Sequence, residues 1–309
     1  MRTNLFLIST LLICFSCTKE VDLDIPELPQ KVVVNSLFCP DSVMQIHVSL
    51  TAGITEPKIN NVDNATVKLF ENDVLIKTIV SQQNGFYNSM YMPKVGKEYR
   101  VEVVVPGFDV VWAEDKVPEN GPIQTFTCKV DDDFNQFGGQ NSKTILSFQD
   151  IVGELSFFEL LFYPMVNGNV YLNSGFGVSQ TDKTNDFSIV ADGDIDMNPL
   201  TIYFSDNLFI DQEKELEFNG FGSFEFNSAT NQKIYNYFIA DFKSVSKHYY
   251  NFRKSWTKHL FNQNSDAHYD DPLTLLFLGD PIEMYSNVTN GYGIFAGYNK
   301  QAVTITYVE

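Results

Sequence analysis

The chain has 309 residues, of which 44% are hydrophobic and 14% aromatic, and its formal net charge is −18 at pH 7. This length can bury a sizeable core and fits two domains. A surface this acidic repels phosphate backbones and anionic headgroups, which argues against a nucleic-acid partner and against flat docking on anionic lipid.

The first 16 residues have the layout of a bacterial signal peptide. Arg2 provides the positive start, an apolar run covers residues 5–15, and the small residue Ser16 precedes Cys17. As a helix the apolar run would span about 16 Å, roughly half of a bilayer's hydrocarbon core. The segment is therefore too short for a stable transmembrane anchor.

Cys17 is the predicted lipidation site, because a small residue before a cysteine suits cleavage by the lipoprotein signal peptidase. The leucine usual three residues before the cysteine is replaced by Cys14. Cys14 itself follows the bulky Ile13 and fits the cleavage pocket less well. Plain secretion with cleavage elsewhere is the alternative. Two or more acyl chains give lasting attachment, so we expect an outer-membrane lipoprotein.

Residues 17–29 are polar and mainly acidic, and they run into Pro26 and Pro29. Such a segment cannot bury apolar area and is predicted to be an extended tether. Lys19 and the acids beside the cysteine resemble the signal that sends lipoproteins of Bacteroidetes-type bacteria to the cell surface. The choice between the surface and the periplasmic leaflet stays open.

Residues 30–120 are predicted to form an antiparallel β-sandwich, of transthyretin-like or Ig-like type. Apolar and polar residues alternate along several short segments that are separated by turn signals, as in half-buried strands. The predicted strands are residues 32–38, 44–50, 65–70, 74–80 and 99–103. Residues 118–122, rich in proline and glycine, are the predicted joint to a second domain.

Residues 121–309 are predicted to form a β-rich domain with one amphipathic helix. Ser246 is a plausible N-cap, and the helix is placed at residues 247–261, with aromatic and apolar residues three or four apart on one stripe. The predicted strands are residues 145–148, 157–163, 200–204, 215–226, 235–242, 273–278 and 302–308.

The predicted helix also supplies the candidate binding residues, Tyr249, Arg253 and Trp256, because exposed aromatics can stack on sugar rings or grip a peptide. Its basic cluster could contact a carboxylate-rich partner or lipid phosphate. Core packing of the aromatics and a solvated basic face are the simpler interpretations. The cluster consists of Lys247, His248, Arg253, Lys254, Lys258 and His259.

Two cysteines remain after the signal peptide and the lipidated residue, Cys39 and Cys128. An exported protein can oxidise such a pair. Two cysteines so far apart in a core of this size are more often unpaired and buried, which is the interpretation we favour.

No sequence motif indicates catalysis, a cofactor or a metal. Asp192, Asp194 and Asp196 begin like a calcium loop, but that loop needs glycine at its sixth position and glutamate at its twelfth, where Met197 and Tyr203 stand. The glycines of residues 290–298 lack the Lys-Ser/Thr pair of a phosphate loop and are better explained by a tight crossing of strands. We therefore predict a protein that is not an enzyme.

Several stretches together resemble the Bacteroidetes lipoprotein family labelled domain of unknown function 4249. They are the acidic leader, residues 31–38 with Pro40, Asp41 and Ser42, residues 62–67, and above all residues 285–295. The resemblance implies no catalytic residues. Family members are often encoded beside TonB-dependent receptors, which implies an accessory role in nutrient uptake with such a receptor as partner. The glycan or peptide ligand is expected from the aromatic residues of the helix, not from the resemblance. A surface adhesin or structural protein is the main alternative, and a hydrolase with a dispersed site is the third.

Overall fold

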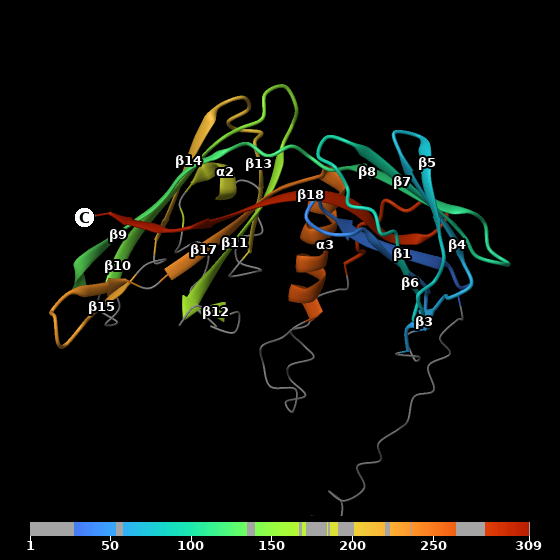
Figure 1. Ribbon diagram of the computed structural model, residues 1–309, viewed down its shortest axis with the longest axis horizontal. Coiled ribbons are helices and arrows are strands. Elements are labelled where there is room, and N and C mark those ends of the chain that lie inside the picture. Colours follow the sequence, from blue (N-terminus) through green and yellow to red (C-terminus); the bar gives the residue numbers. More distant parts are fainter. Residues whose placement is uncertain are drawn as a thin grey trace, which may run out of the picture.

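The computed structural model describes residues 28–53, 58–134, 140–166, 169–170, 184, 186–190, 201–219, 223–235, 237–263 and 282–308 (Figure 1). The signal peptide, Cys17 and all but the last two residues of the tether lie outside these ranges. So do Asp192, Asp194 and Asp196 and the strand predicted at residues 273–278.

The protein is mainly β, and residues 32–117 build a sandwich of two facing sheets. One sheet contains β1 (Val32–Phe38), β2 (Gln45–Leu50), β3 (Asn60–Asn61) and β6 (Phe86–Asn88), and the other has the order β5-β4-β7-β8, with β4 (Thr66–Glu71), β5 (Val74–Ile79), β7 (Glu98–Val104) and β8 (Val111–Lys116). Alternate residues point inward, as Tyr99, Val101 and Val103 do on β7. The core between the sheets is rich in valine and includes Val34, Val48 and Val67.

The remaining strands form a second β-rich part whose core is rich in phenylalanine. Phe148, Phe158, Phe204 and Phe242 lie in mutual ring contact there. The strands are β9 (Ile123–Phe134), β10 (Gln140–Gln149), β11 (Phe157–Val166), β12 (Asn169–Val170), β13 (Thr201–Ser205), β14 (Glu213–Asn219), β15 (Phe224–Phe226), β16 (Lys233–Tyr235), β17 (Tyr237–Val245) and β19 (Thr306–Val308).

One long strand, β18 (Tyr292–Thr304), joins the two parts and runs through the middle of the molecule (Figure 1). Its first half pairs in parallel with β1, from Val33–Tyr292 to Phe38–Gly297. Its second half pairs antiparallel with β17, from Val245–Tyr298 to Ile239–Thr304. The division of the chain near residue 120 stays a prediction, but a strand from the far end of the sequence completes the first sandwich.

The helix α3 (Lys247–Gln263) lies beside β18, where the two parts meet (Figure 1). Ser246 caps it as predicted, because its Oγ accepts a hydrogen bond from the Tyr249 N–H at 3.1 Å. A second, four-residue helix, α2 (Phe187–Val190), has no counterpart in the sequence prediction. Over the ranges that the structure covers, every helix is too short or too polar to cross a bilayer.

Several details differ from the sequence predictions. The strand expected at residues 215–226 is two separate strands, β14 and β15, and residues 302–308 are divided between the end of β18 and β19. The sandwich is not purely antiparallel, because β1 and β18 run in parallel. Cys39 and Cys128 are both buried and free, as favoured from their spacing.

Candidate functional site

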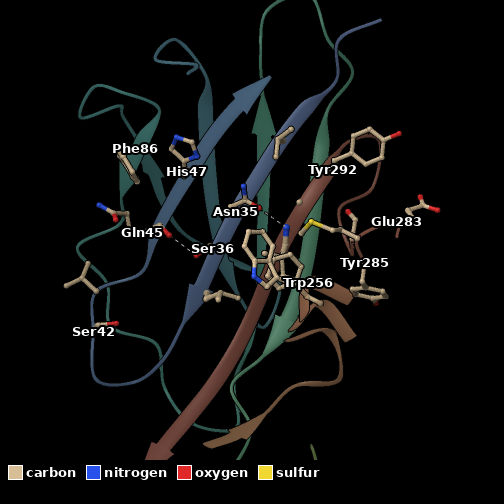
Figure 2. A pocket seen from close by; sticks show the side chains of 18 residues that line it. Asn35, Ser36, Ser42, Gln45, His47, Phe86, Trp256, Glu283, Tyr285 and Tyr292 are labelled. Atoms are coloured by element: carbon tan, nitrogen blue, oxygen red, sulfur yellow. Dashed lines mark hydrogen bonds between the residues drawn. The ribbon is translucent and has the colours of Figure 1, made fainter. Parts of the chain in front are cut away.

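An open groove of about 900 Å³ lies on the outer face of the first sandwich, between the β2–β1–β18 sheet and α3. Figure 2 shows Trp256, Tyr285 and Glu283 on one side, Phe86, Gln45 and His47 on the other, and Asn35 between them. The other lining residues are Val33, Ser36, Leu37, Ser42, Val43, Phe252, Met284, Ser286, Tyr292, Gly293 and Ile294.

The floor of the groove is set by the two-residue period of the strands. On β1 the even-numbered residues are buried in the sandwich, so that Val33, Asn35 and Leu37 point outward. Gln45 and His47 point the same way from β2. Asn35 Oδ1 accepts a hydrogen bond from the Ile294 N–H at 3.2 Å, which fixes the amide and presents its NH₂ group at the floor.

A glycine allows β18 to approach this floor. Gly293 has φ = +115°, and a Cβ atom there would lie 2.1 Å from the carbonyl oxygen of Val34. Only glycine tolerates both the positive φ and a neighbouring carbonyl oxygen at this distance. The glycines of residues 290–298 thus mark a close approach of strands, but β18 pairs in parallel with β1 and does not cross it. Tyr292 lies at the rim of the groove.

One wall comes from α3. Phe252 and Trp256 are four residues apart on one helical face, with ring centroids 6.2 Å apart, and both line the groove. Trp256 is 39% exposed and Phe86 on the opposite side is 40% exposed. Large aromatic surfaces on both sides are therefore open to solvent and available to a ligand.

The segment 282–286 extends this wall and is tied to α3 by three hydrogen bonds. The Tyr285 N–H donates to Ser255 Oγ at 2.8 Å, and His259 Nδ1 donates to the Ile282 carbonyl at 3.0 Å. His248 Nδ1 and the Tyr285 hydroxyl lie 2.6 Å apart. Two residues of the predicted basic cluster, His248 and His259, thus hold the wall in place.

Few charged groups lie in or at the rim of the groove, although the protein is strongly acidic. Burial, and then the nearby Lys247, lower the pKa of His248, and burial raises the pKa of Tyr285. This contact is therefore uncharged at neutral pH. Glu283 is the carboxylate of the lining, and Lys31 Nζ lies 5.2 Å from the centroid of the Tyr292 ring at the rim. His47 Nε2 lies 3.0 Å from Asn61 Oδ1. The rest of the lining consists mainly of aromatic, aliphatic, amide and hydroxyl side chains.

The three candidate binding residues on α3 are divided between two surroundings. Trp256 lines the groove, whereas Tyr249 and Arg253 face the sheet beneath the helix. There the Tyr249 hydroxyl donates to Glu159 Oε2 at 3.0 Å, and Arg253 Nε lies 3.5 Å from the same oxygen. Lys243 forms an ion pair with the other oxygen of Glu159.

We call these four residues, Glu159, Lys243, Tyr249 and Arg253, the buried ionic cluster. Glu159 is 1% exposed, and Arg253 Nε also donates to the Tyr203 hydroxyl at 3.0 Å. Two cations and a hydroxyl around one carboxylate satisfy a buried charge. The geometry indicates that this cluster anchors α3 on the sheet.

Sequence reasoning missed the half of the groove that comes from β1, β2 and β18. The available signal was the outward polar residues Asn35, Gln45 and His47 within predicted strands. That pattern shows which residues face away from the core, but it does not show that α3 lies beside them. In the ranges that the structure describes, no three His, Cys, Asp or Glu residues are grouped so as to hold a metal ion.

The family model described as "Domain of unknown function (DUF4249)" matches residues 18–303. The chain belongs to this family. A comparison with curated proteins finds no match. Every residue that lines the groove of this DUF4249 chain lies within the matched range, and so does α3.

Proposed function

We propose that this DUF4249 chain is a non-enzymatic, lipid-anchored protein of the outer membrane that binds a neutral oligosaccharide in the groove, as an accessory component of TonB-dependent nutrient uptake. The observation that carries the proposal is the groove itself: open, lined by exposed aromatic rings, and almost uncharged in a protein of net charge −18.

The chemistry of the lining favours a sugar. The apolar faces of sugar rings stack on aromatic side chains, and sugar hydroxyls exchange hydrogen bonds with amide and hydroxyl groups. Trp256, Phe86 and Tyr292 supply the rings, and Asn35 and Gln45 supply the amides. A volume of about 900 Å³ is near the upper end of the usual range for small-ligand sites, roughly 300–1,000 Å³. This size suits several linked sugar units.

The charge of the protein and of the groove further restricts the class of ligand. The acidic surface repels acidic glycans and acidic peptides, and an almost neutral lining gives a charged group no partner to replace its water. Neutral glycans incur neither cost.

Tryptophan fluorescence offers a direct binding test, because the chain has two tryptophans, of which Trp256 lines the groove and Trp112 lies on β8. A panel of neutral oligosaccharides, acidic oligosaccharides and peptides is titrated into the protein. We expect a neutral oligosaccharide to change the emission and to bind with micromolar to millimolar affinity.

Two variants show which tryptophan gives the change in fluorescence. Trp256→Phe should lose the fluorescence response, whereas Trp112→Phe should keep both the response and the affinity. A response that survives in Trp256→Phe and vanishes in Trp112→Phe would place the ligand elsewhere, and a panel without any binding would refute the proposal.

Anchoring and partnership need separate experiments. Intact-mass analysis of the native protein should find an acylated Cys17, and a Cys17→Ser variant should leave the membrane fraction. Capture of the native protein from detergent-solubilised outer membranes should recover a TonB-dependent receptor. Repeated capture without a receptor would contradict the uptake role and leave the groove's ligand as a separate question.

A further inference from the structure

Two loops at one end of the second β-rich part are interlocked. Residues 150–156 connect β10 to β11, and residues 206–212 connect β13 to β14. The Asp150 N–H donates to the Gln212 carbonyl at 3.2 Å, and the Asp206 N–H donates to the Ser156 carbonyl at 3.1 Å. Each loop is thus bonded to the other through its backbone.

Three aspartates strengthen this interlock, each with one carboxylate oxygen. Asp150 Oδ2 accepts from the Asp211 N–H at 2.9 Å, and Asp206 Oδ2 accepts from the Ser156 N–H at 2.8 Å. Asp211 Oδ1 accepts from the Gly153 N–H at 2.7 Å. These bonds hold the carboxylates of Asp150 and Asp206 in fixed positions.

The second oxygens of Asp150 and Asp206 have no such partner. Asp150 is 3% exposed and Asp206 is 0% exposed, and apart from each other the two buried Oδ1 atoms have no hydrogen-bond partner among the described residues. Burial first, and then the charge of Asp150 and a side-chain hydrogen bond with it, raise the pKa of Asp206. Among the described residues, no lysine or arginine forms an ion pair with either group.

Two adjacent buried carboxylates without a counter-charge are costly, because each loses its water and repels the other. A bound cation removes both costs. Carboxylate and backbone carbonyl oxygens are the ligands that Ca²⁺ prefers, and Mg²⁺ is often held by one or two carboxylates with water completing its shell.

We propose that Asp150 and Asp206 form a divalent-cation site, selective for Ca²⁺, which locks the two loops together. Oδ1 of each aspartate is a ligand, and backbone carbonyls or water provide the rest. Two carboxylates are enough for such a site, so the proposal agrees with the absence of a grouped set of three metal-binding side chains among the described residues.

The site would also stiffen the contact between the two parts of the molecule. Glu154, in the first loop, forms an ion pair with Lys116 at the end of β8. Residues 151, 152 and 154–157 line a cleft of about 820 Å³ whose other side includes Asp115, Lys116 and Val117 of the first sandwich. Locking the loop therefore fixes one side of this cleft.

The test compares thermal unfolding of the purified protein after EDTA treatment and dialysis, with and without added CaCl₂ or MgCl₂. Because a ligand that binds only the folded state stabilises it, Ca²⁺ should raise the melting temperature by several degrees, and Mg²⁺ should raise it less. Equilibrium dialysis should find about one bound Ca²⁺ per chain, the stoichiometry of a single site.

Matched variants separate the site from general charge effects. Asp150→Asn and Asp206→Asn should each lose the response to Ca²⁺. Asp211→Asn removes one negative charge from the same loop but keeps the oxygen that accepts from Gly153, and it should keep the response. If Asp206→Asn does not fold, Asp150→Asn and the stoichiometry of the native chain decide the question.

Three results would overturn the proposal: no Ca²⁺ binding by dialysis, a response that persists in Asp150→Asn, or a melting temperature that rises on acidification and ignores every cation. The last result would show that the carboxyl groups share a proton instead. None of these outcomes depends on whether the groove binds a glycan, so this proposal and the proposed function can fail separately.

Discussion

The two faces of α3 have opposite chemistry. The face toward the sheet meets the buried ionic cluster, where Arg253 and Tyr249 surround the carboxylate of Glu159. The face toward the groove presents Phe252 and Trp256 beside an almost uncharged lining. This difference indicates that the two faces have separate roles. Ionic contacts fix the helix in position on one face, and the aromatic surface of the other face is available to bind a ligand.

The largest effect is expected at the centre of the cluster. Glu159→Ala would leave Lys243 and Arg253 without their buried partner, which costs about 3–5 kcal/mol in free energy of unfolding. Glu159→Gln keeps an oxygen that can accept from Tyr249 and should cost less than Glu159→Ala. Urea denaturation measures both, and a loss under about 1 kcal/mol in Glu159→Ala would show that the cluster does not anchor the helix.

A pH effect is expected where the first sandwich meets the start of α3. Asp115 on β8 accepts hydrogen bonds from Ser246, the cap of α3, and from the Gly297 N–H, and burial raises the pKa of its carboxyl to about 7. The folded state therefore holds the proton more tightly than the unfolded state, whose pKa is near 3.8. Stability contributed by this group is present below pH 4 and is lost as the pH rises toward 7.

For a single group with this shift, the loss between pH 4 and pH 7 is about 3 kcal/mol. The measurement is the difference in unfolding free energy between the native protein and Asp115→Asn, followed over that range. Asp115→Asn cannot titrate and should become relatively more stable as the pH rises. Parallel curves for the two proteins would rule out a titrating Asp115 at this junction.

The local elements could be predicted from the sequence because their signals lie within short segments. Alternation on residues 32–38 and the stripe that follows Ser246 are such signals, and β1 and α3 begin where they indicate. Their physical cause is the strand and helix periodicity itself. The cap at Ser246 follows equally from local chemistry.

The groove could not be predicted, because its two sides come together only through long-range pairing. Val33 and Tyr292 are partners on β1 and β18, and no local pattern specifies that register. The buried ionic cluster could not be predicted from the sequence for the same reason. Glu159 stands in an apolar run, and its partners Lys243 and Arg253 come from other elements. Before its partners are known, Arg253 is indistinguishable from a solvated helix residue.

A smaller effect is expected where the wall of the groove is attached to α3. Ser255→Ala removes the acceptor for the Tyr285 N–H, a hydrogen bond worth about 1 kcal/mol in stability. The wall should loosen, and glycan affinity should fall by up to about fivefold, which corresponds to the same 1 kcal/mol. Ser147→Ala, which removes a side-chain hydrogen bond with Thr125 outside the groove lining, is the matched control and should keep the affinity. Equal affinities in the two variants would show that the Ser255 bond does not position the wall.

The clearest contrast with Glu159 is expected for Trp256→Ala. The residue is 39% exposed, and its contact among the described rings is with Phe252, so the free energy of unfolding should fall by about 2 kcal/mol, less than in Glu159→Ala. Oligosaccharide binding should nevertheless be lost, because a central aromatic platform dominates such a site. Calorimetric titration and urea denaturation of the same sample give both values. If Trp256→Ala unfolds as readily as Glu159→Ala, the groove face of α3 stabilises the fold instead of serving recognition, and the division between the two faces is wrong.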